Sequence, residues 1–295
     1  MKLNKKSIEN LKLNLVLLFI FFLLNNLAFS SEQTVNSEST NYNYKIEEMS
    51  IATDNGKKIY GQLYLPDHLD KKIPIVISAH GYGGTHKNNK DYAEALARQG
   101  IAVYNFDFCG GSLDSKSDGK TTEMSVLTEV NDLKNVLSYL QKLDYVETNS
   151  IFLLGISQGG MVSSIIASEK LDEIAGMILI YPAFVIPDDV KKKYDSIDKI
   201  PETTEWMGMQ LGKVYFADML DYNIYEKIPF YDKNVLIIHG DKDELVNISY
   251  SQKAQEVYPN SELKIINGAG HGFNENDKKI VIEYMIDYIN KNLGN

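Results

Sequence analysis

The stretch that decides the fold is Gly155-Ile156-Ser157-Gln158-Gly159, which lies between an apolar run and an amphipathic segment. Residues 151–156 have the length and composition of a buried strand, and residues 158–170 have the spacing of a helix. A serine at such a sharp turn needs small neighbours, because bulky residues at the glycine positions would collide with the adjoining strand and helix. A glycine-rich turn with a capping serine is the alternative. The strand and helix on either side favour an exposed, reactive serine instead.

Short apolar runs alternate with amphipathic helical stretches on both sides of this motif. Such alternation requires crossover connections and predicts an α/β fold with a mostly parallel, buried central sheet flanked by helices. The predicted strands are residues 73–79, 101–108, 151–156, 174–180, 235–239 and 263–266. The predicted helices are residues 91–99, 124–143, 158–170, 250–257 and 278–291. Ahead of them, residues 45–53 and 57–65 flank Asp54-Asn55-Gly56, which predicts an antiparallel hairpin at the leading edge.

One segment, about residues 184–233, breaks the alternation. It is rich in Tyr, Met and Asp, contains the only tryptophan, Trp206, and stands where a strand should pass directly to the next helix. We interpret it as a cap inserted after the sixth strand, over the carboxyl edge of the sheet. The domain that carries this cap spans residues 44–295 in our interpretation.

The first residues of the chain have the features of an export signal. Four lysines precede the apolar run of residues 15–24, and Ala28-Phe29-Ser30 has the small residues that a signal peptidase requires. The run is shorter than the roughly 20 apolar residues of a spanning helix, which disfavours a membrane anchor. We therefore expect a signal peptide over residues 1–30, a polar flexible leader over residues 31–43, and a secreted or periplasmic protein without stable membrane insertion after cleavage.

The net charge of the chain narrows the range of expected partners. Without residues 1–30, which hold four lysines and one glutamate, the chain has a formal net charge of −13. An acidic surface disfavours polyanions, so neither nucleic acid nor an anionic membrane is an expected partner.

Cys109 is the single cysteine and can form no internal disulfide, so the core alone must stabilise the fold. We expect a packed or loop thiol there.

A catalytic role for Ser157 requires a base within hydrogen-bond reach and a partner that orients this base. Two loops after predicted strands supply candidates in the order serine, acid, histidine. The first contains Asp241, Asp243 and Glu244, which compete for the acid role, and the second contains His271. Parallel strands end at one edge of a sheet, so these side chains can converge on Ser157.

The other histidines fit structural roles better. His68 and His86 lie in polar stretches and are expected to be solvated. His80 and His239 each end a predicted strand and precede a glycine, a position typical of a packed, hydrogen-bonded histidine. By elimination, His271 is the candidate base.

Acyl transfer also needs hydrogen-bond donors for the developing oxyanion. The loop His80-Gly81-Tyr82-Gly83-Gly84 follows the first parallel strand, where one backbone donor is expected, and the residue after the serine provides the other. We assign these N–H groups to Tyr82 and Gln158. The loop lacks the lysine and hydroxyl pair of a phosphate cradle, and the mechanism requires no metal or organic cofactor.

From about Tyr44 to its C-terminus the chain resembles α/β hydrolases of the cinnamoyl (feruloyl) esterase group and related serine aminopeptidase-like hydrolases. The stretches that carry the resemblance are SAHGYGG, FDFCGGSLDSKSDGKTTEMSVLTEV, LLGISQGG, LIIHGDKDELV and GAGHGF. Where relatives commonly have G-H-G in the second stretch, this chain has Cys109-Gly110-Gly111 and a few extra residues.

The resemblance implies the α/β-hydrolase fold and selects Asp243, because the second acid of the H-G-D-x-D-x-x-V loop completes the triad in the superfamily. Asp241 is then a turn residue that bonds its own loop. Alignment with cinnamoyl esterases puts Asp189 and Tyr215 near positions that contact the phenolic end of the substrate.

The function expected from these features is hydrolysis of carboxylic esters through an acyl-serine intermediate. Hydroxycinnamoyl esters or other small acyl esters, free or linked to polysaccharide, are the expected substrates. A serine aminopeptidase is an alternative, because such enzymes need acidic cap residues and this cap contains Asp188, Asp189 and Asp218. An acyltransferase would use the same residues. A non-catalytic binding protein is the least favoured reading, since the triad is intact. The sequence does not set the oligomeric state.

Overall fold

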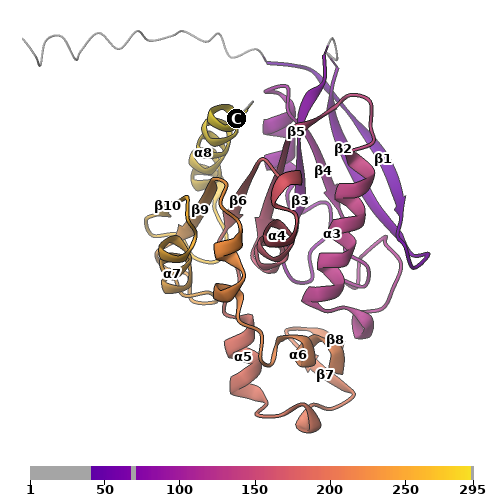
Figure 1. Cartoon of the computed structure of the whole chain (residues 1–295), viewed down its shortest axis with the longest axis vertical. Coiled ribbons are helices and arrows are strands. Elements are labelled where there is room, and N and C mark those ends of the chain that lie inside the picture. Colours follow the sequence, from indigo (N-terminus) through magenta and orange to yellow (C-terminus); the bar gives the residue numbers. More distant parts are fainter. Residues whose placement is uncertain (1–40, 68–70, 294–295) are drawn as a thin grey trace, which may run out of the picture. The chain divides into compact units, whose positions relative to one another are not determined.

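Strand β5 (Val146–Ile156), which ends next to Ser157, lies inside an eight-stranded sheet of order β1-β2-β4-β3-β5-β6-β9-β10 (Figure 1). The computed structural model describes residues 41–67 and 71–293. From β4 to β10 the neighbouring strands are parallel, whereas the hairpin of β1 and β2 joins the sheet antiparallel to β4. The other strands of this sheet are β1 (Tyr44–Ala52), β2 (Lys58–Pro66), β3 (Ile73–Ala79), β4 (Ala102–Phe106), β6 (Gly176–Ile180), β9 (Val235–Gly240) and β10 (Ser261–Ile266). The predicted α/β architecture is confirmed.

Helices cover both faces of this sheet, which explains why its parallel strands are almost continuously apolar. On one face, Leu96 and Val281 join the buried cluster that includes Leu154 of β5. On the other face, Leu133 and Val162 join the cluster that includes Leu153. The first face carries α2 (Lys90–Ala97) and α8 (Glu275–Asn292), and the second carries α3 (Val126–Leu140), α4 (Gln158–Glu169) and α7 (Ser249–Val257).

Some observed boundaries differ from the predicted ones for local reasons. Helix α3 begins at Val126 because Ser125 caps it: the Ser125 hydroxyl accepts from the backbone N–H of Thr128, whose hydroxyl accepts from the N–H of Ser125. Strand β5 begins earlier than residue 151, because Val146 already pairs with Ile73 across an irregularity in the register.

The segment between β6 and β9 forms a layer of its own beyond the carboxyl ends of the strands (Figure 1). It holds a small hairpin that the sequence did not predict, in which β7 (Thr203–Trp206) pairs with β8 (Met209–Gly212). The other elements here are α5 (Ile186–Lys193), α6 (Lys213–Met219), η3 (Ile197–Lys199), η4 (Ile224–Glu226) and η5 (Ile228–Phe230). Two further 3₁₀ turns lie elsewhere, η1 (Thr121–Glu123) and η2 (Leu171–Glu173). The inserted cap after the sixth strand is therefore present, and we keep that name for residues 184–233.

The cap rests closely on the main domain at η1. The Thr121 hydroxyl donates to the carbonyl of Gln210 at 2.6 Å. A methyl group on Gly212 would lie 2.0 Å from the carbonyl oxygen of Thr122, so only glycine permits this approach of the two backbones.

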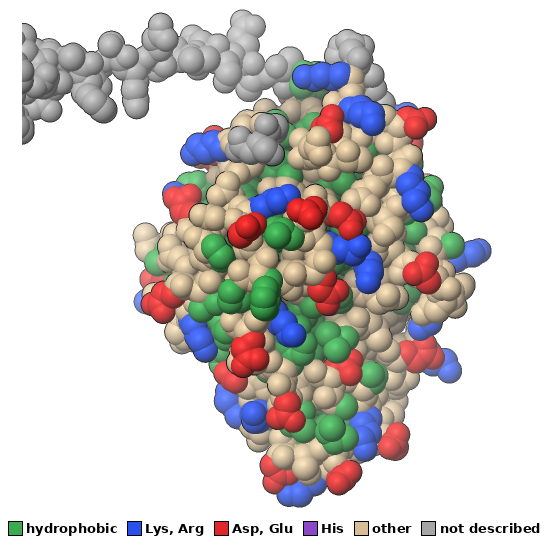
Figure 2. Space-filling model, viewed as in Figure 1, with side chains coloured by type: hydrophobic (Ala, Val, Ile, Leu, Met, Phe, Trp, Pro, Cys, Tyr) green, Lys and Arg blue, Asp and Glu red, His purple; other side chains and the backbone are tan. Residues whose placement is uncertain are grey.

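The predicted signal peptide, residues 1–30, most of the predicted leader, and His68 lie outside the described residues. Within the described ranges, no helix combines the length and apolar character needed to span a bilayer. Figure 2 shows basic and acidic side chains interspersed over the visible face of the described residues.

The first prediction concerns the close backbone packing at Gly159. A Cβ at this position would lie 2.2 Å from the carbonyl oxygen of Ala79 and 2.5 Å from that of His80, and both atoms are backbone of the neighbouring strand end. Gly159→Ala should lower the free energy of unfolding by about 3 kcal/mol through this overpacking, measured by urea denaturation. Gly270→Ala is the matched control, because its Cβ would meet only the Lys242 carbonyl at 3.6 Å. Equal unfolding midpoints for the two variants would contradict the packing argument.

Candidate active site

Ser157 stands at the turn from β5 into α4 in a backbone conformation that serine rarely adopts, with φ 52° and ψ −118°. Such strain persists only where the surroundings enforce it. The Ser157 N–H donates to the carbonyl of Ile180 on β6, and the Ser157 carbonyl accepts from Gly160 and Ala183. A Cβ on Gly155 would come within 2.6 Å of Gly159 and Gly160, so small residues are required on both sides of the serine, as the motif predicts.

The structure brings Ser157, His271 and Asp243 together from three separate loops. The Nε2 atom of His271 lies 2.9 Å from the Ser157 hydroxyl oxygen, and its Nδ1 atom lies 2.7 Å from Oδ2 of Asp243. Asp243 follows β9 and His271 follows β10, and these two strands are parallel neighbours. In the neutral imidazole with its proton on Nδ1, Nε2 is free to accept the serine proton.

Of the three candidates for the acid, Asp241, Asp243 and Glu244, Asp243 accepts the most hydrogen bonds. Its Oδ1 atom accepts from the backbone N–H groups of Leu245 and Val246 at 2.9 and 2.8 Å. Its Oδ2 atom lies 3.1 Å from Nε2 of His239 in addition to its contact with His271. Burial acts to raise the pKa of Asp243, but hydrogen bonds from His239, His271 and the Val246 N–H outweigh it and hold the pKa well below its usual range.

The other two acids of this loop lie elsewhere. Asp241 accepts a hydrogen bond from the backbone N–H of Gly268 at 2.5 Å, so it joins its loop to the one that carries His271. The prediction that Asp241 bonds its own loop is therefore wrong, because the parallel pairing of β9 and β10 places the two loops side by side. Glu244 is exposed.

His239 is buried and structural, as predicted, yet its contact with Asp243 was missed. Its Nδ1 atom lies 2.7 Å from the Ser251 hydroxyl, and its Nε2 atom lies 2.9 Å from the Val246 carbonyl. The sequence did contain one signal, since His239 and Asp243 are four residues apart across the tight turn that ends β9.

The loop with Tyr82 passes directly over the serine. A Cβ on Gly81 would lie 3.1 Å from Cβ of Ser157, so this loop borders the reacting oxygen. Gln158 is the first residue of α4, where a helix has no internal acceptor for the N–H group. Within residues 41–67 and 71–293, neither Tyr82 nor Gln158 donates its backbone N–H to another backbone group.

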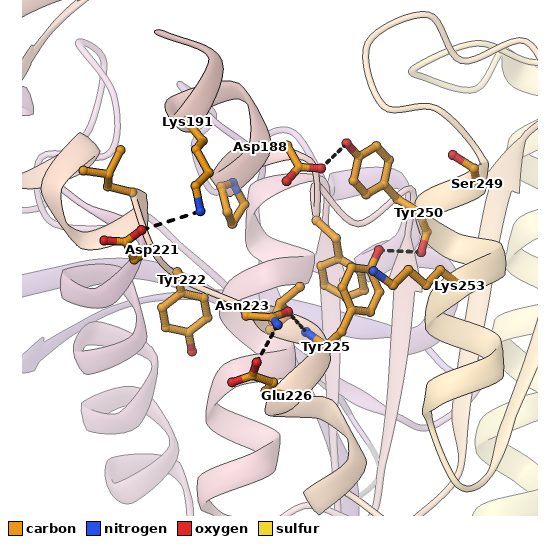
Figure 3. A pocket seen from close by; sticks show the side chains of 14 residues that line it. Asp188, Lys191, Asp221, Tyr222, Asn223, Tyr225, Glu226, Ser249, Tyr250 and Lys253 are labelled. Atoms are coloured by element: carbon orange, nitrogen blue, oxygen red, sulfur yellow. Dashed lines mark hydrogen bonds and ion pairs between the residues drawn. The ribbon is translucent and has the colours of Figure 1, made fainter. Parts of the chain in front are cut away.

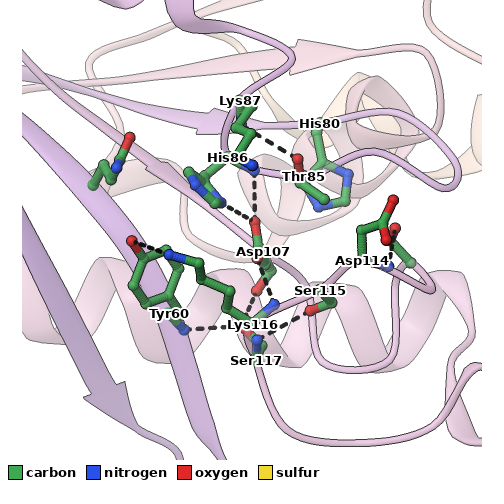
Figure 4. A network of polar contacts seen from close by, with 12 residues as sticks. Tyr60, His80, Thr85, His86, Lys87, Asp107, Asp114, Ser115, Lys116 and Ser117 are labelled. Carbon is green, nitrogen blue, oxygen red and sulfur yellow. Dashed lines mark hydrogen bonds and ion pairs between the residues drawn. The ribbon is translucent and has the colours of Figure 1, made fainter.

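A buried polar network holds this loop in place (Figure 4). Oδ1 of Asp107 accepts from both the backbone N–H and the Nδ1 atom of His86, at 2.6 and 2.7 Å, and Oδ2 accepts from the N–H of Lys116. His86 is only 3% exposed, so the prediction that it is solvated is wrong. The polar sequence around His86 does not reveal this burial, because its partner Asp107 is 21 residues away. His80 is buried and hydrogen-bonded as predicted, accepting from the Phe108 N–H.

Two pockets meet at Ser157. The first, of about 60 Å³, lies under the cap. Both cap residues predicted to contact substrate, Asp189 and Tyr215, line it, as do Tyr82, Trp206 and Met207. The second pocket, of about 360 Å³, also borders Ser157 and includes His271. Met207 and Leu245, both exposed, line the two pockets, as do Tyr82 and Ser157.

Tyr215 is tied to the residue next to the serine. Its hydroxyl donates to Oε1 of Gln158 at 2.8 Å, and Nε2 of Gln158 donates to Oε2 of Glu129 at 2.8 Å. Glu129 is 1% exposed, and burial raises its pKa well above the usual range although the bond from Gln158 opposes this. Asp189 pairs with Lys192 at 3.0 Å.

A third hollow, of about 580 Å³, contains none of Ser157, Asp243 and His271. It lies between the cap and α7, where the Tyr250 hydroxyl donates to Asp188 and the Tyr225 hydroxyl donates to the carbonyl of Tyr250 (Figure 3). Asp188 and Asp189 thus face different cavities although they are adjacent on α5. We assign the chemistry to the two pockets that Ser157 borders, although both are smaller than this hollow.

Within the described part of the chain, no group of three or more His, Cys, Asp or Glu side chains is arranged to hold a metal ion. Cys109 is 5% exposed, and burial raises the pKa of its thiol above the usual range, so it is a packed thiol as expected.

Comparisons with known proteins agree with this geometry. Residues 70–216 match the family described as "Serine aminopeptidase, S33". The solved structure "Ferulic Acid bound to Est1E from Butyrivibrio proteoclasticus" is 27% identical with a TM-score of 0.76, over 84% of this chain and 100% of that one.

Curated relatives include lipases. The chain is 23% identical to a monoacylglycerol lipase of Mycolicibacterium smegmatis over 82% of this chain and 96% of that protein. It is 31% identical to the monoglyceride lipase of Rattus norvegicus over 45% of this chain. The chain spans 42% of the length of the rat lipase and between 27% and 34% of the length of three further curated relatives. The parallel sheet, the strained serine turn and these relatives together show a hydrolase of the α/β-hydrolase superfamily, with esterase, lipase and aminopeptidase relatives.

Proposed function

We propose that the protein is a serine carboxylic-ester hydrolase that acts through an acyl-serine intermediate. The observation that carries the proposal is the continuous chain from the Ser157 hydroxyl through both ring nitrogens of His271 to Asp243, at 2.9 and 2.7 Å. This series of hydrogen bonds begins at the strained turn of Ser157, and Ser157 borders two pockets.

The residues perform the reaction in a definite order. As the oxygen of Ser157 attacks the ester carbonyl carbon, its proton passes to Nε2 of His271, and the ionised Asp243 stabilises the resulting imidazolium. The carbonyl oxygen becomes negative beside the backbone N–H groups of Tyr82 and Gln158. The ester C–O bond then breaks and His271 gives its proton to the departing alcohol. Water repeats the sequence on the acyl-serine and releases the acid.

The positions of the cap acids favour an esterase over an aminopeptidase. A substrate amino group would need unpaired carboxylates near the serine. Asp188 accepts from Tyr250 in the distant hollow, and Asp218 accepts from the Ser125 hydroxyl. Only Asp189 lines a pocket with Ser157, and Lys192 already neutralises it.

We further propose aromatic, hydroxycinnamoyl-type acids as preferred acyl groups. The pocket under the cap is walled by Trp206, Met207 and Tyr215, while Asp189 and the Tyr215 hydroxyl provide polar groups. A bound ferulic acid in the similar Est1E structure supports this choice. At about 60 Å³ the pocket is smaller than most small-molecule sites, which begin near about 300 Å³, so entry of an aromatic ring requires some of the lining side chains to move.

The triad assignment gives a direct prediction. Ser157→Ala and His271→Ala should each lower kcat by about 10⁴ to 10⁶, and Asp243→Asn by about 10⁴. Asp241→Asn is the matched control, because it removes an acid of the same loop that does not contact His271, and its loss should be far smaller. Steady-state hydrolysis of a short acyl ester measures all four. A folded Ser157→Ala protein with normal turnover would rule out the acyl-serine route.

The pH profile separates His271 from Asp243. His271 must be neutral to accept the serine proton, so kcat/KM should rise with pH through the range, about 5 to 8, in which histidines titrate. Asp243 has a depressed pKa and stays ionised throughout that range. Its contribution to stability is therefore present above the usual carboxyl pKa and is lost only as pH falls below it. A flat profile from pH 5 to 8 in the folded enzyme contradicts a histidine base.

Substrate preference is tested by comparing kcat/KM for methyl ferulate with that for ethyl or butyl acetate. The aromatic ester should be favoured, and Tyr215→Phe should reduce this preference about fivefold, because one buried hydroxyl is lost from the pocket. Tyr194→Phe is the matched control: it also removes a cap hydroxyl, bonded to Thr204, but does not line the pocket. An enzyme that shows no preference for the aromatic ester is a general carboxylesterase.

A further inference from the structure

The peptide unit between Ser157 and Gln158 contains the N–H group that we assign to the oxyanion, and this inference rests on that proposed function. Because a peptide unit is planar, the ψ angle of Ser157, −118°, sets the direction of the N–H. The carbonyl oxygen of the same unit accepts from the backbone N–H groups of Gly160 and Ala183. In the described part of the chain the N–H itself donates to no backbone group. Restraint at the nitrogen end therefore has to come from the rest of Gln158.

The side chain of Gln158 is buried and is held at both ends. Its Oε1 atom accepts from the Tyr215 hydroxyl on α6, and its Nε2 atom donates to Oε2 of Glu129 on α3, each at 2.8 Å. A buried amide with hydrogen bonds at both ends has little freedom to rotate. Tyr215 belongs to the inserted cap, whereas Glu129 belongs to a helix packed on the central sheet. Glu129 therefore connects Gln158 to the main domain.

A carboxyl group at position 129 costs the fold stability. The side chain is buried, the described residues provide it with no cationic partner, and its charged neighbour is a second acid, Asp132. Burial raises the pKa of Glu129 well above the usual range, and the hydrogen bond from Gln158 opposes this rise only in part. A residue that is unfavourable at its position calls for a role that an apolar side chain could not perform.

The surroundings of Glu129 fix where its carboxyl group lies. Its backbone N–H donates to the carbonyl of Ser125 in the first turn of α3, at 3.0 Å. A Cβ on Gly111 would lie 3.3 Å from Oε1 of Glu129, so the loop after β4 lies against the oxygen that does not bind Gln158. The carboxyl group is thus held between this loop and the amide.

From these contacts we propose that Glu129 is a positioning residue of the esterase reaction: its carboxyl oxygen holds the amide of Gln158 and thereby directs the Gln158 backbone N–H toward the oxyanion. Glu129 lines neither of the pockets that Ser157 borders, so it acts through Gln158 and not on the substrate. Its effect is greatest in the transition state, where the oxyanion develops its charge, and small in the binding of a neutral ester.

The test removes the acceptor in Glu129→Leu and restores it in Glu129→Gln, whose amide oxygen can accept from Gln158. For a short acyl ester, kcat should fall about tenfold in Glu129→Leu, while KM stays within about twofold of the native value. The loss is smaller than the roughly 10²- to 10³-fold effect of deleting an oxyanion donor, because the donor is displaced and not removed. Glu129→Gln should retain roughly half of the native kcat or more.

Asp132→Leu is the matched control. Asp132 is also a buried acid of α3, three residues after Glu129, but its Oδ2 atom accepts from the backbone N–H of Cys109 at 2.7 Å and not from Gln158. Its loss should lower the midpoint of urea unfolding and leave kcat at the native value. An equal fall of kcat in this variant would make the effect of α3 merely structural and overturn the proposal.

A double-variant cycle tests whether Glu129 acts through Gln158. Gln158→Leu removes both side-chain hydrogen bonds and keeps the backbone N–H, so its kcat should fall at least as far as that of Glu129→Leu. The variant with both substitutions should lose no more than Gln158→Leu alone. It leaves neither the carboxyl nor the amide buried without a partner, so the comparison of these two variants also serves if Glu129→Leu alone does not fold.

Failure of this inference differs from failure of the proposed function. The positioning role is overturned, and the esterase left intact, by native kcat in folded Glu129→Leu or Gln158→Leu, by a loss that appears in KM alone, or by losses that multiply in the double variant. Folded native protein that hydrolyses no ester overturns the proposed function itself.

Discussion

The constraint on which the rest of the structure depends is the close packing at the end of β5. Ser157 keeps its positive φ only because the backbone of Gly159 lies against the carbonyls of Ala79 and His80, and the backbone of Gly160 lies against Pro182. Three neighbouring strands, β3, β5 and β6, therefore meet at the serine. Every loop that approaches Ser157 starts from this edge. The geometry of the site is thus a property of the sheet rather than of any one loop.

The orientation of His271 at this edge of the sheet depends on Asp243. Its two oxygens accept four hydrogen bonds, from two backbone N–H groups and two histidine rings. A carboxylate with all its acceptor positions used has one orientation, and it fixes the tautomer of His271. His239 has a part in this although it is far from any substrate, because it is locked in turn by Ser251 and the Val246 carbonyl. A buried second histidine thus makes the orientation of the first less dependent on solvent.

Much of this arrangement was readable from the sequence, because it is local. The G-x-S-x-G turn, the strands and the acidic and histidine loops are contiguous stretches, and the parallel sheet dictates where their ends meet. Several of the features that escaped depend on partners distant in sequence. Nothing near His86 indicates that Asp107 buries it, and nothing near Tyr92 and Tyr181 indicates that the two share a pocket. The β7–β8 hairpin was missed because four-residue strands give too short a pattern.

A bridge of side chains links the cap to Gln158, the residue that follows the serine. In the mechanism that we propose, Gln158 provides a backbone N–H for the oxyanion, while its side chain bridges Tyr215 of the cap and the buried Glu129 of α3. Burial raises the pKa of Glu129 well above its usual range and so favours its neutral form beside the Gln158 amide. A change in the cap that moves Tyr215 would therefore also disturb Gln158. This bridge joins the pocket under the cap to the residue that follows the serine, whereas the pocket around Tyr92 contains neither Gln158 nor Tyr215.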